Sequence, residues 1–122
     1  MFMKASEIYQ DYDKRVQDYM QNVIDCIKQD YKVIPSSWRI TIDLIAMNFS
    51  ILIQAEKDIK EKGIFYKDEF ERMTKNPNLM VFNQAQNQII KYLSTFGLTP
   101  ISKTRLKNFN SDQINIDSLI ND

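Results

Sequence analysis

The side chains that most often perform catalysis are scarce in this sequence. Histidine is absent, and Cys26 is the only cysteine. These counts exclude His-ligated metal sites, Ser-His triads and Cys-His dyads, because each needs residues that the chain lacks. The only two glycines, Gly63 and Gly97, are too far apart to form the Gly-x-x-x-x-Gly-Lys phosphate loop of ATPases. We therefore expect a protein that is not an enzyme and uses no metal or other cofactor.

Charged residues are distributed unevenly along the chain. Up to residue 71 there are thirteen acidic and ten basic residues, spaced as on solvated helix faces, so we expect none of the acids to be catalytic. Residues 72–111 contain no acid. The basic residues of that segment are candidate DNA contacts: Arg72, Lys75, Lys91, Lys103, Arg105 and Lys107. Because the net charge of the whole chain is zero, strong non-specific DNA binding by a single copy is not expected.

Apolar residues recur at helical spacing, and chain breakers are few, which predicts an all-α protein. Proline, glycine and N-cap residues divide the sequence into two long N-terminal helices, a third amphipathic helix and a short fourth helix. The expected helices cover residues 6–31, 37–62, 77–96 and 100–107. The connector between the second and third helices, residues 64–75, fits either a short helix or a strand-like crossing. No apolar run is long enough to span a membrane.

One stripe of the first helix could form a subunit interface. Its members recur at alternating spacings of three and four: Tyr9, Tyr12, Val16, Tyr19 and Val23. The helix either packs within its own bundle or bridges its own core and another subunit. The tyrosines favour a partly hydrated seam, because each hydroxyl needs a hydrogen-bond partner. The second helix is apolar nearly all round, which predicts a buried central helix.

A family resemblance rests on the third helix and the corner after it. Residues 75–77, Lys-Asn-Pro, precede an amphipathic helix, and residues 97–106 read Gly-Leu-Thr-Pro-Ile-Ser-Lys-Thr-Arg-Leu. This pattern resembles the signature of a phage terminase small-subunit family, with its N-P start and its G-L-T-P-x-S-R-x-R-L close. The resemblance covers roughly residues 14–107, and only residues 75–106 are specific. Lys103 stands where the family usually has arginine, which keeps the charge and loses the bidentate geometry.

The resemblance implies a non-catalytic subunit that recognises the packaging site on viral double-stranded DNA. Such a subunit presents the DNA to a large subunit, which carries the ATPase and the nuclease. The resemblance also implies an oligomeric ring of identical copies, acting in the cytoplasm of the infected bacterial host. Residues 1–107 would then form one helical domain. The remaining tail, residues 108–122, is a candidate docking segment.

The corner that carries the resemblance has two interpretations. In one, Lys103, Arg105 and Lys107 contact DNA. In the other, the motif is purely structural, and its members only end helices and fill the core: Asn76, Pro77, Gly97, Leu98, Thr99, Pro100 and Leu106. Under the second interpretation the chain could be a helical protein–protein interaction or scaffold module without direct DNA contact.

Overall fold

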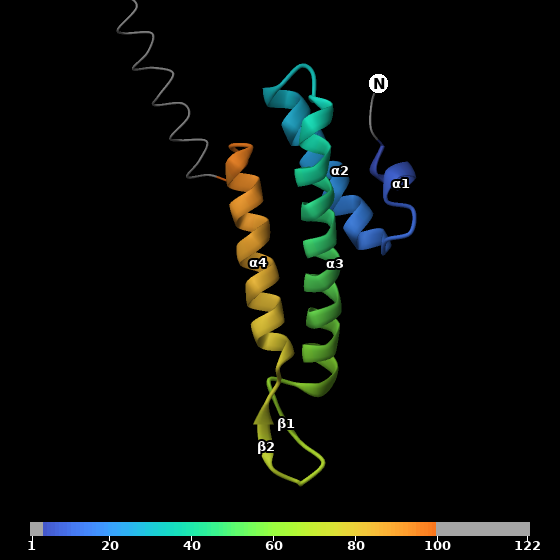
Figure 1. The fold of residues 1–122 in the computed structure, drawn as a ribbon. Coiled ribbons are helices and arrows are strands. Elements are labelled where there is room, and N and C mark those ends of the chain that lie inside the picture. Colours follow the sequence, from blue (N-terminus) through green and yellow to red (C-terminus); the bar gives the residue numbers. More distant parts are fainter. Residues whose placement is uncertain (1–3, 100–122) are drawn as a thin grey trace, which may run out of the picture.

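The structure is a computed structural model that describes residues 4–99, and these residues form a helical protein with one small β-hairpin (Figure 1). The all-α expectation is thus confirmed in part: the described chain is mostly helical, and the connector takes the strand-like of its two alternatives and forms two short strands. In chain order the elements are α1 (Ala5–Ile8), α2 (Lys14–Asp30), the 3-10 turn η1 (Ser36–Trp38), α3 (Arg39–Lys62), β1 (Phe65–Lys67), β2 (Met73–Lys75) and α4 (Asn78–Thr95). The expected helix over residues 100–107 and the tail lie outside the described residues.

Helix α3 is the central element of the described fold. α4 runs beside it along most of its length, and α2 packs on another side of its first half (Figure 1). The short α1 packs against α2. The hairpin projects from the end where α3 finishes and α4 begins, away from α1 and α2 (Figure 1). The two faces of α4 therefore differ, because one is covered by α3 and the other is open in the single chain.

The expected first helix is divided in two, which corrects the prediction of one helix over residues 6–31. The chain leaves the helix at Tyr9, and α2 begins after Asp13, whose Oδ1 accepts the backbone N–H of Arg15 at 2.9 Å. The side chain of Gln17 reaches back and donates to the carbonyl oxygens of Tyr9 and Tyr12, at 3.1 and 3.0 Å. Asp13 is thus an N-cap, and Gln17 holds the turn that precedes it.

The stripe proposed as a subunit interface lies inside the core of the single chain. Tyr9, Val16 and Val23 are buried, and Tyr12 and Tyr19 pack partly buried against the same cluster. Its centre is formed by fully buried residues of α2 and α3: Met20, Ile24, Ile27, Ile42 and Ile45. Another subunit could not reach the buried members of this stripe, Tyr9, Val16 and Val23, without opening the core. The burial favours the interpretation of a helix packed in its own bundle.

The prediction that the second long helix is buried all round is wrong for one of its faces. Neither α2 nor α4 covers Ile40, Met47 and Ile51, whose exposed fractions are 71%, 50% and 43%. Its end is as predicted, because Gly63 stops α3 with a positive φ of 87° and donates its N–H to Ile59. Cys26 is half-buried.

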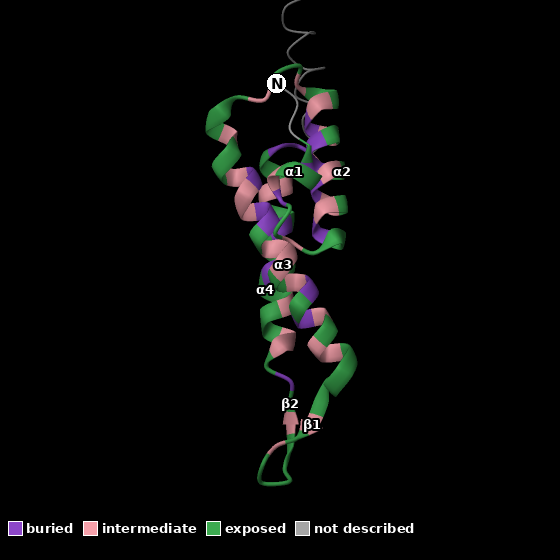
Figure 2. Ribbon diagram, turned by 90° about the vertical axis from the view of Figure 1, so that its right-hand side faces the viewer, coloured by how far each residue is buried: buried purple, intermediate pink, exposed green. Residues whose placement is uncertain are grey.

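The connector forms an antiparallel hairpin in which Phe65 pairs with Lys75 and Lys67 with Met73. Asp68 builds its turn by accepting the backbone N–H groups of Phe70 and Arg72, at 2.8 and 3.0 Å. Most of the hairpin is exposed, and its strands are three residues long (Figure 2). Because isolated two-stranded hairpins are only marginally stable, the anchor at its base must hold it.

Candidate nucleic-acid interface

The anchor of the hairpin is also the joint at which α4 begins. Asn76 is only 1% exposed, and its backbone N–H donates to the carbonyl oxygen of Ile64. Its side-chain oxygen accepts the backbone N–H of Asn78 at 2.9 Å, which caps α4 as the Asn-Pro pattern predicted. Its Nδ2 donates to Gly63 O and to Asp58 Oδ2, both at 3.0 Å. One side chain thus ties the end of α3, the base of the hairpin and the start of α4.

Asp58 completes this joint from the last turns of α3. Asn78 Nδ2 donates to the same Oδ2 at 2.7 Å, and Lys62 Nζ lies 3.1 Å from Oδ1. Hydrogen bonds from Asn78, Asn76 and Lys62, in that order of size, lower the pKa of this carboxyl. Asp58 did not stand out in the sequence, since it lies within a run of alternating charges. Its structural role depends on a contact across eighteen residues of chain.

The far end of α4 is closed by Gly97, as expected. With a φ of 72°, Gly97 donates its N–H to Ser94 O, and Leu98 donates to Leu93 O. These two bonds form a Schellman motif, which needs a residue in the left-handed conformation. Leu98 packs partly buried against the core, also as expected. The expected capping role of Thr99 concerns a helix outside the described residues, as do the expected roles of Pro100 and Leu106.

Between these two ends, the outer side of α4 carries amide side chains beside the exposed apolar residues Met80 and Ile90. Ala85 and Ile89 are buried on the side of α3. Asn87 lies two positions from each of them, about 200° around the axis, so it points away from α3. Asn83 and Gln84 are exposed on the same outer side. We call Asn83, Gln84 and Asn87 the amide face. A cavity of about 400 Å³ lies along it and is also lined by Lys75 and Met80.

The structure separates the described basic candidates into two groups. Arg72 directly precedes β2 and Lys75 is its last residue, whereas Lys91 lies near the other end of α4. Arg72 is partly engaged, with its Nε 3.7 Å from Asp68 Oδ2 and its guanidinium 5.1 Å from the centre of the Phe70 ring. Lys75 and Lys91 are exposed and form no ion pair within residues 4–99. Lys103, Arg105 and Lys107 lie outside the described residues.

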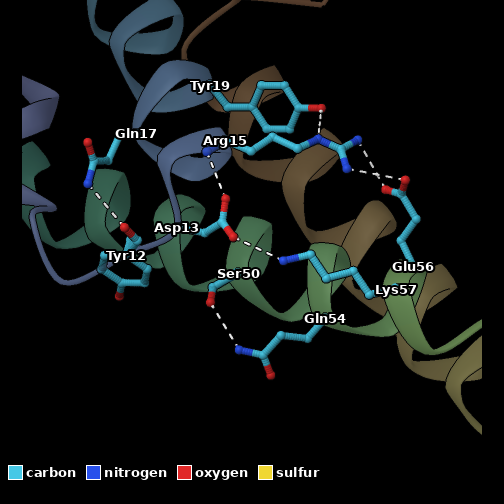
Figure 3. A network of polar contacts seen from close by, with 9 residues as sticks. All are labelled: Tyr12, Asp13, Arg15, Gln17, Tyr19, Ser50, Gln54, Glu56 and Lys57. Atoms are coloured by element: carbon cyan, nitrogen blue, oxygen red, sulfur yellow. Dashed lines mark hydrogen bonds and ion pairs between the residues drawn. The ribbon is translucent and has the colours of Figure 1, made fainter.

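Two acidic side chains, Asp13 and Glu56, lie between α2 and α3, where cations neutralise them (Figure 3). Asp13 Oδ2 lies 3.0 Å from Lys57 Nζ, and Glu56 lies 3.1 Å from Arg15 and 2.8 Å from Lys60. The backbone N–H of Arg15, and then Lys57, lower the pKa of Asp13. A general acid needs a raised pKa, so these groups are suited to holding α2 on α3 rather than to proton transfer.

Within residues 4–99, acidic side chains and Cys26 form no group of three that could hold a metal ion. In the same residues, no helix combines the length and apolarity that crossing a bilayer requires.

A family model described as "Phage terminase, small subunit" matches residues 28–113, which is most of the 122-residue chain. The chain belongs to this family. Comparisons with curated proteins and with solved structures gave no significant match. The matched residues include α3, the hairpin and α4, together with the asparagine joint. Membership of this family indicates a role in packaging phage DNA, and small terminase subunits are in general non-catalytic.

Proposed function

We propose that the chain is the non-catalytic small subunit of a viral DNA-packaging terminase, which recognises viral double-stranded DNA and presents it to the ATPase–nuclease large subunit. The family match carries this proposal. Three observations on the described residues support it: the outer side of α4 has no acid, two exposed lysines flank it, and the carboxylates between α2 and α3 are held in ion pairs. The subunit would act in the cytoplasm of the infected bacterium.

The exposed stripe of α3 supports assembly of identical copies into a ring. Ile40, Met47 and Ile51 are spaced by seven and four residues, so they lie on one side of the helix. A continuous stripe of large exposed apolar side chains usually marks an interface with another protein. Their occupant in this proposal is a second copy of the chain. The stripe replaces the largely buried tyrosine-rich stripe of residues 9–23 as the candidate oligomer interface.

Light scattering with and without two lysine substitutions tests the assembly. The wild-type chain should be a multimer, and Met47→Lys with Ile51→Lys should shift the mass toward the monomer, because charges would be buried between copies. Gln29→Lys, at an exposed position of α2, is the matched control and should leave the mass unchanged. A wild-type chain that stays monomeric at high concentration would contradict the ring.

Salt dependence tests the contact with DNA. A labelled 30-base-pair duplex should bind more weakly as salt rises from about 50 to 200 mM, because each phosphate contact releases counterions. Replacing Lys103, Arg105 and Lys107 by alanine should flatten this dependence if the segment after α4 contacts phosphate. An unchanged slope would move the DNA surface to other residues. A ring would multiply weak contacts, so the mass of each variant must be measured under the same conditions.

An interaction or scaffold module without DNA contact is the second candidate. It is favoured by the structural roles of Asn76 and Gly97, because both motif residues close the ends of α4 and need no ligand. This candidate predicts a multimer that binds no duplex even at low salt. Measured DNA binding that weakens with salt would exclude it.

A further inference from the structure

Helix α4 has an unusual composition for a helix at the surface. Only one of its 18 residues is charged, whereas six of 17 are charged in α2 and eight of 24 in α3. Six of its residues are instead asparagine or glutamine. Charged residues would keep an exposed helix in solution as well as amides do, and the same chain uses them on α2 and α3. The outer side of α4 therefore calls for an explanation other than solubility.

The amide face is free to accept a partner. Asn83, Gln84 and Asn87 form no hydrogen bond with any residue between 4 and 99, whereas Asn76 and Asn78 are held in the joint. Asn83, Asn87 and Lys91 follow one another at spacings of four, so they form a continuous ridge. In the single chain this ridge lies on the side of α4 opposite the buried Ala85 and Ile89, and so faces away from α3.

Amide side chains on an acid-free helix match the major groove of double-stranded DNA. The groove admits an α-helix, and asparagine or glutamine can donate to and accept from the edge of adenine at the same time. A face without carboxylates does not repel the phosphates on either side. We propose that the outer side of α4 enters the major groove and contacts base edges through Asn83, Gln84 and Asn87. This inference rests on the DNA partner of the proposed function and adds the surface and the chemistry of recognition.

The two described lysines are placed to contact phosphates at the ends of this face. Lys75 precedes the first turn of α4, and Lys91 lies thirteen residues after Asn78, or about 20 Å along the axis at 1.5 Å per residue. The major groove is about 12 Å wide between its backbones, so two flexible lysine side chains at this separation can reach phosphates on both sides. Phosphate contacts would then orient the helix, and the amides would supply the sequence preference.

Selection from a pool of random 20-base-pair duplexes separates these two roles. The wild-type chain should enrich particular sequences. The triple variant Asn83→Ala, Gln84→Ala, Asn87→Ala should lose about tenfold or more of its preference for the enriched duplex over the pool, with the salt slope unchanged. Replacing Lys75 and Lys91 by alanine should lower the salt slope by about two and keep the preference. Gln86→Ala with Gln88→Ala, on the flanks of the same helix, is the matched control.

The other possible results of this selection distinguish failure of the inference from failure of the proposed function. A triple variant that keeps the preference overturns the inference and leaves the proposed function intact, as does a wild-type chain that binds duplexes without selecting any. If the triple variant loses only its multimeric mass, the amide face is a contact between copies of the chain. A wild-type chain that binds no duplex at low salt removes the DNA partner and the inference with it. Alanine suits a helix interior, so circular dichroism melts should show all variants folded.

Discussion

Replacing Asn76 tests whether the joint between α3, the hairpin and α4 holds the fold together. Asn76→Ala removes the cap on the N–H of Asn78 and leaves Gly63 O without its side-chain donor. Loss of an N-cap costs about 1 kcal/mol, and a buried group left without a partner costs about 1–3 kcal/mol. The variant should therefore lose about 2–4 kcal/mol of unfolding free energy. For a chain of this size, that corresponds to a fall in Tm of about 10 °C or more.

Asn76→Asp separates the joint from simple capping. Aspartate caps helices as well as asparagine, so capping alone predicts almost no change. In the joint, however, the Nδ2 that donates to Asp58 Oδ2 at 3.0 Å would become a carboxylate oxygen. Two carboxylates would then face each other, and the donor to Gly63 O would be lost as well. We expect Asn76→Asp to be at least as destabilised as Asn76→Ala at pH 7.

Urea unfolding followed by circular dichroism measures both variants. Asn83→Asp is the matched control, because it adds the same charge to the same helix at an exposed position. The control should stay within about 0.5 kcal/mol of the wild type, as exposed substitutions usually do. If Asn76→Asp also stays within that range, the reasoning about the joint is refuted and Asn76 acts as a cap only.

Three further predictions concern the stability of the same fold. Hydrogen bonds from two asparagine side chains and a lysine lower the pKa of Asp58, so the unfolded chain binds more protons at acidic pH. Stability should be constant above about pH 5 and fall as the pH drops through the unfolded value of about 3.9, and Asp58→Asn should flatten this acid limb in urea titrations. Gly63→Ala should cost about 1–3 kcal/mol in thermal melts, because a φ of 87° with a ψ of 174° suits glycine alone. Tyr9→Phe removes a 2.7 Å hydrogen bond to Asp43 and should cost about 1 kcal/mol, with faster amide exchange in α1.

The ends of the long helices could be predicted because single residues determine them. Gly63 and Gly97 have positive φ angles, and Asn76 places an acceptor on the first free N–H of α4. These are local stereochemical effects, so the sequence contains the information directly. The centre of the core was also predictable, since it follows the apolar periodicity of residues 16–27 and 42–53.

The first break and the hairpin could not be predicted in the same way. The apolar spacing continues through Tyr9 and Tyr12 as though the helix were unbroken, and Tyr9 is buried by a contact to Asp43 on α3. The hairpin lacks the Asn-Gly or Gly-Gly signal of a tight turn, because the residue with positive φ is Glu71. Asp68 stabilises that turn through its side chain, which spacing alone does not reveal.

The candidate site shows how structural and recognition roles divide along one helix. Asn76 and Gly97 are committed to ending α4, and their contacts would be needed whatever the protein binds. The outer residues between them do not stabilise the ends of α4 in the described fold. Substituting them should therefore change DNA binding and leave the free energy of unfolding almost unchanged. The fold does not constrain this surface, and it carries amides where the other helices carry charged residues. Such a surface can determine which partner the protein binds. Stability of the Asn83, Gln84 and Asn87 variants should therefore match the wild type, while the Asn76 variants should lose stability and DNA binding together.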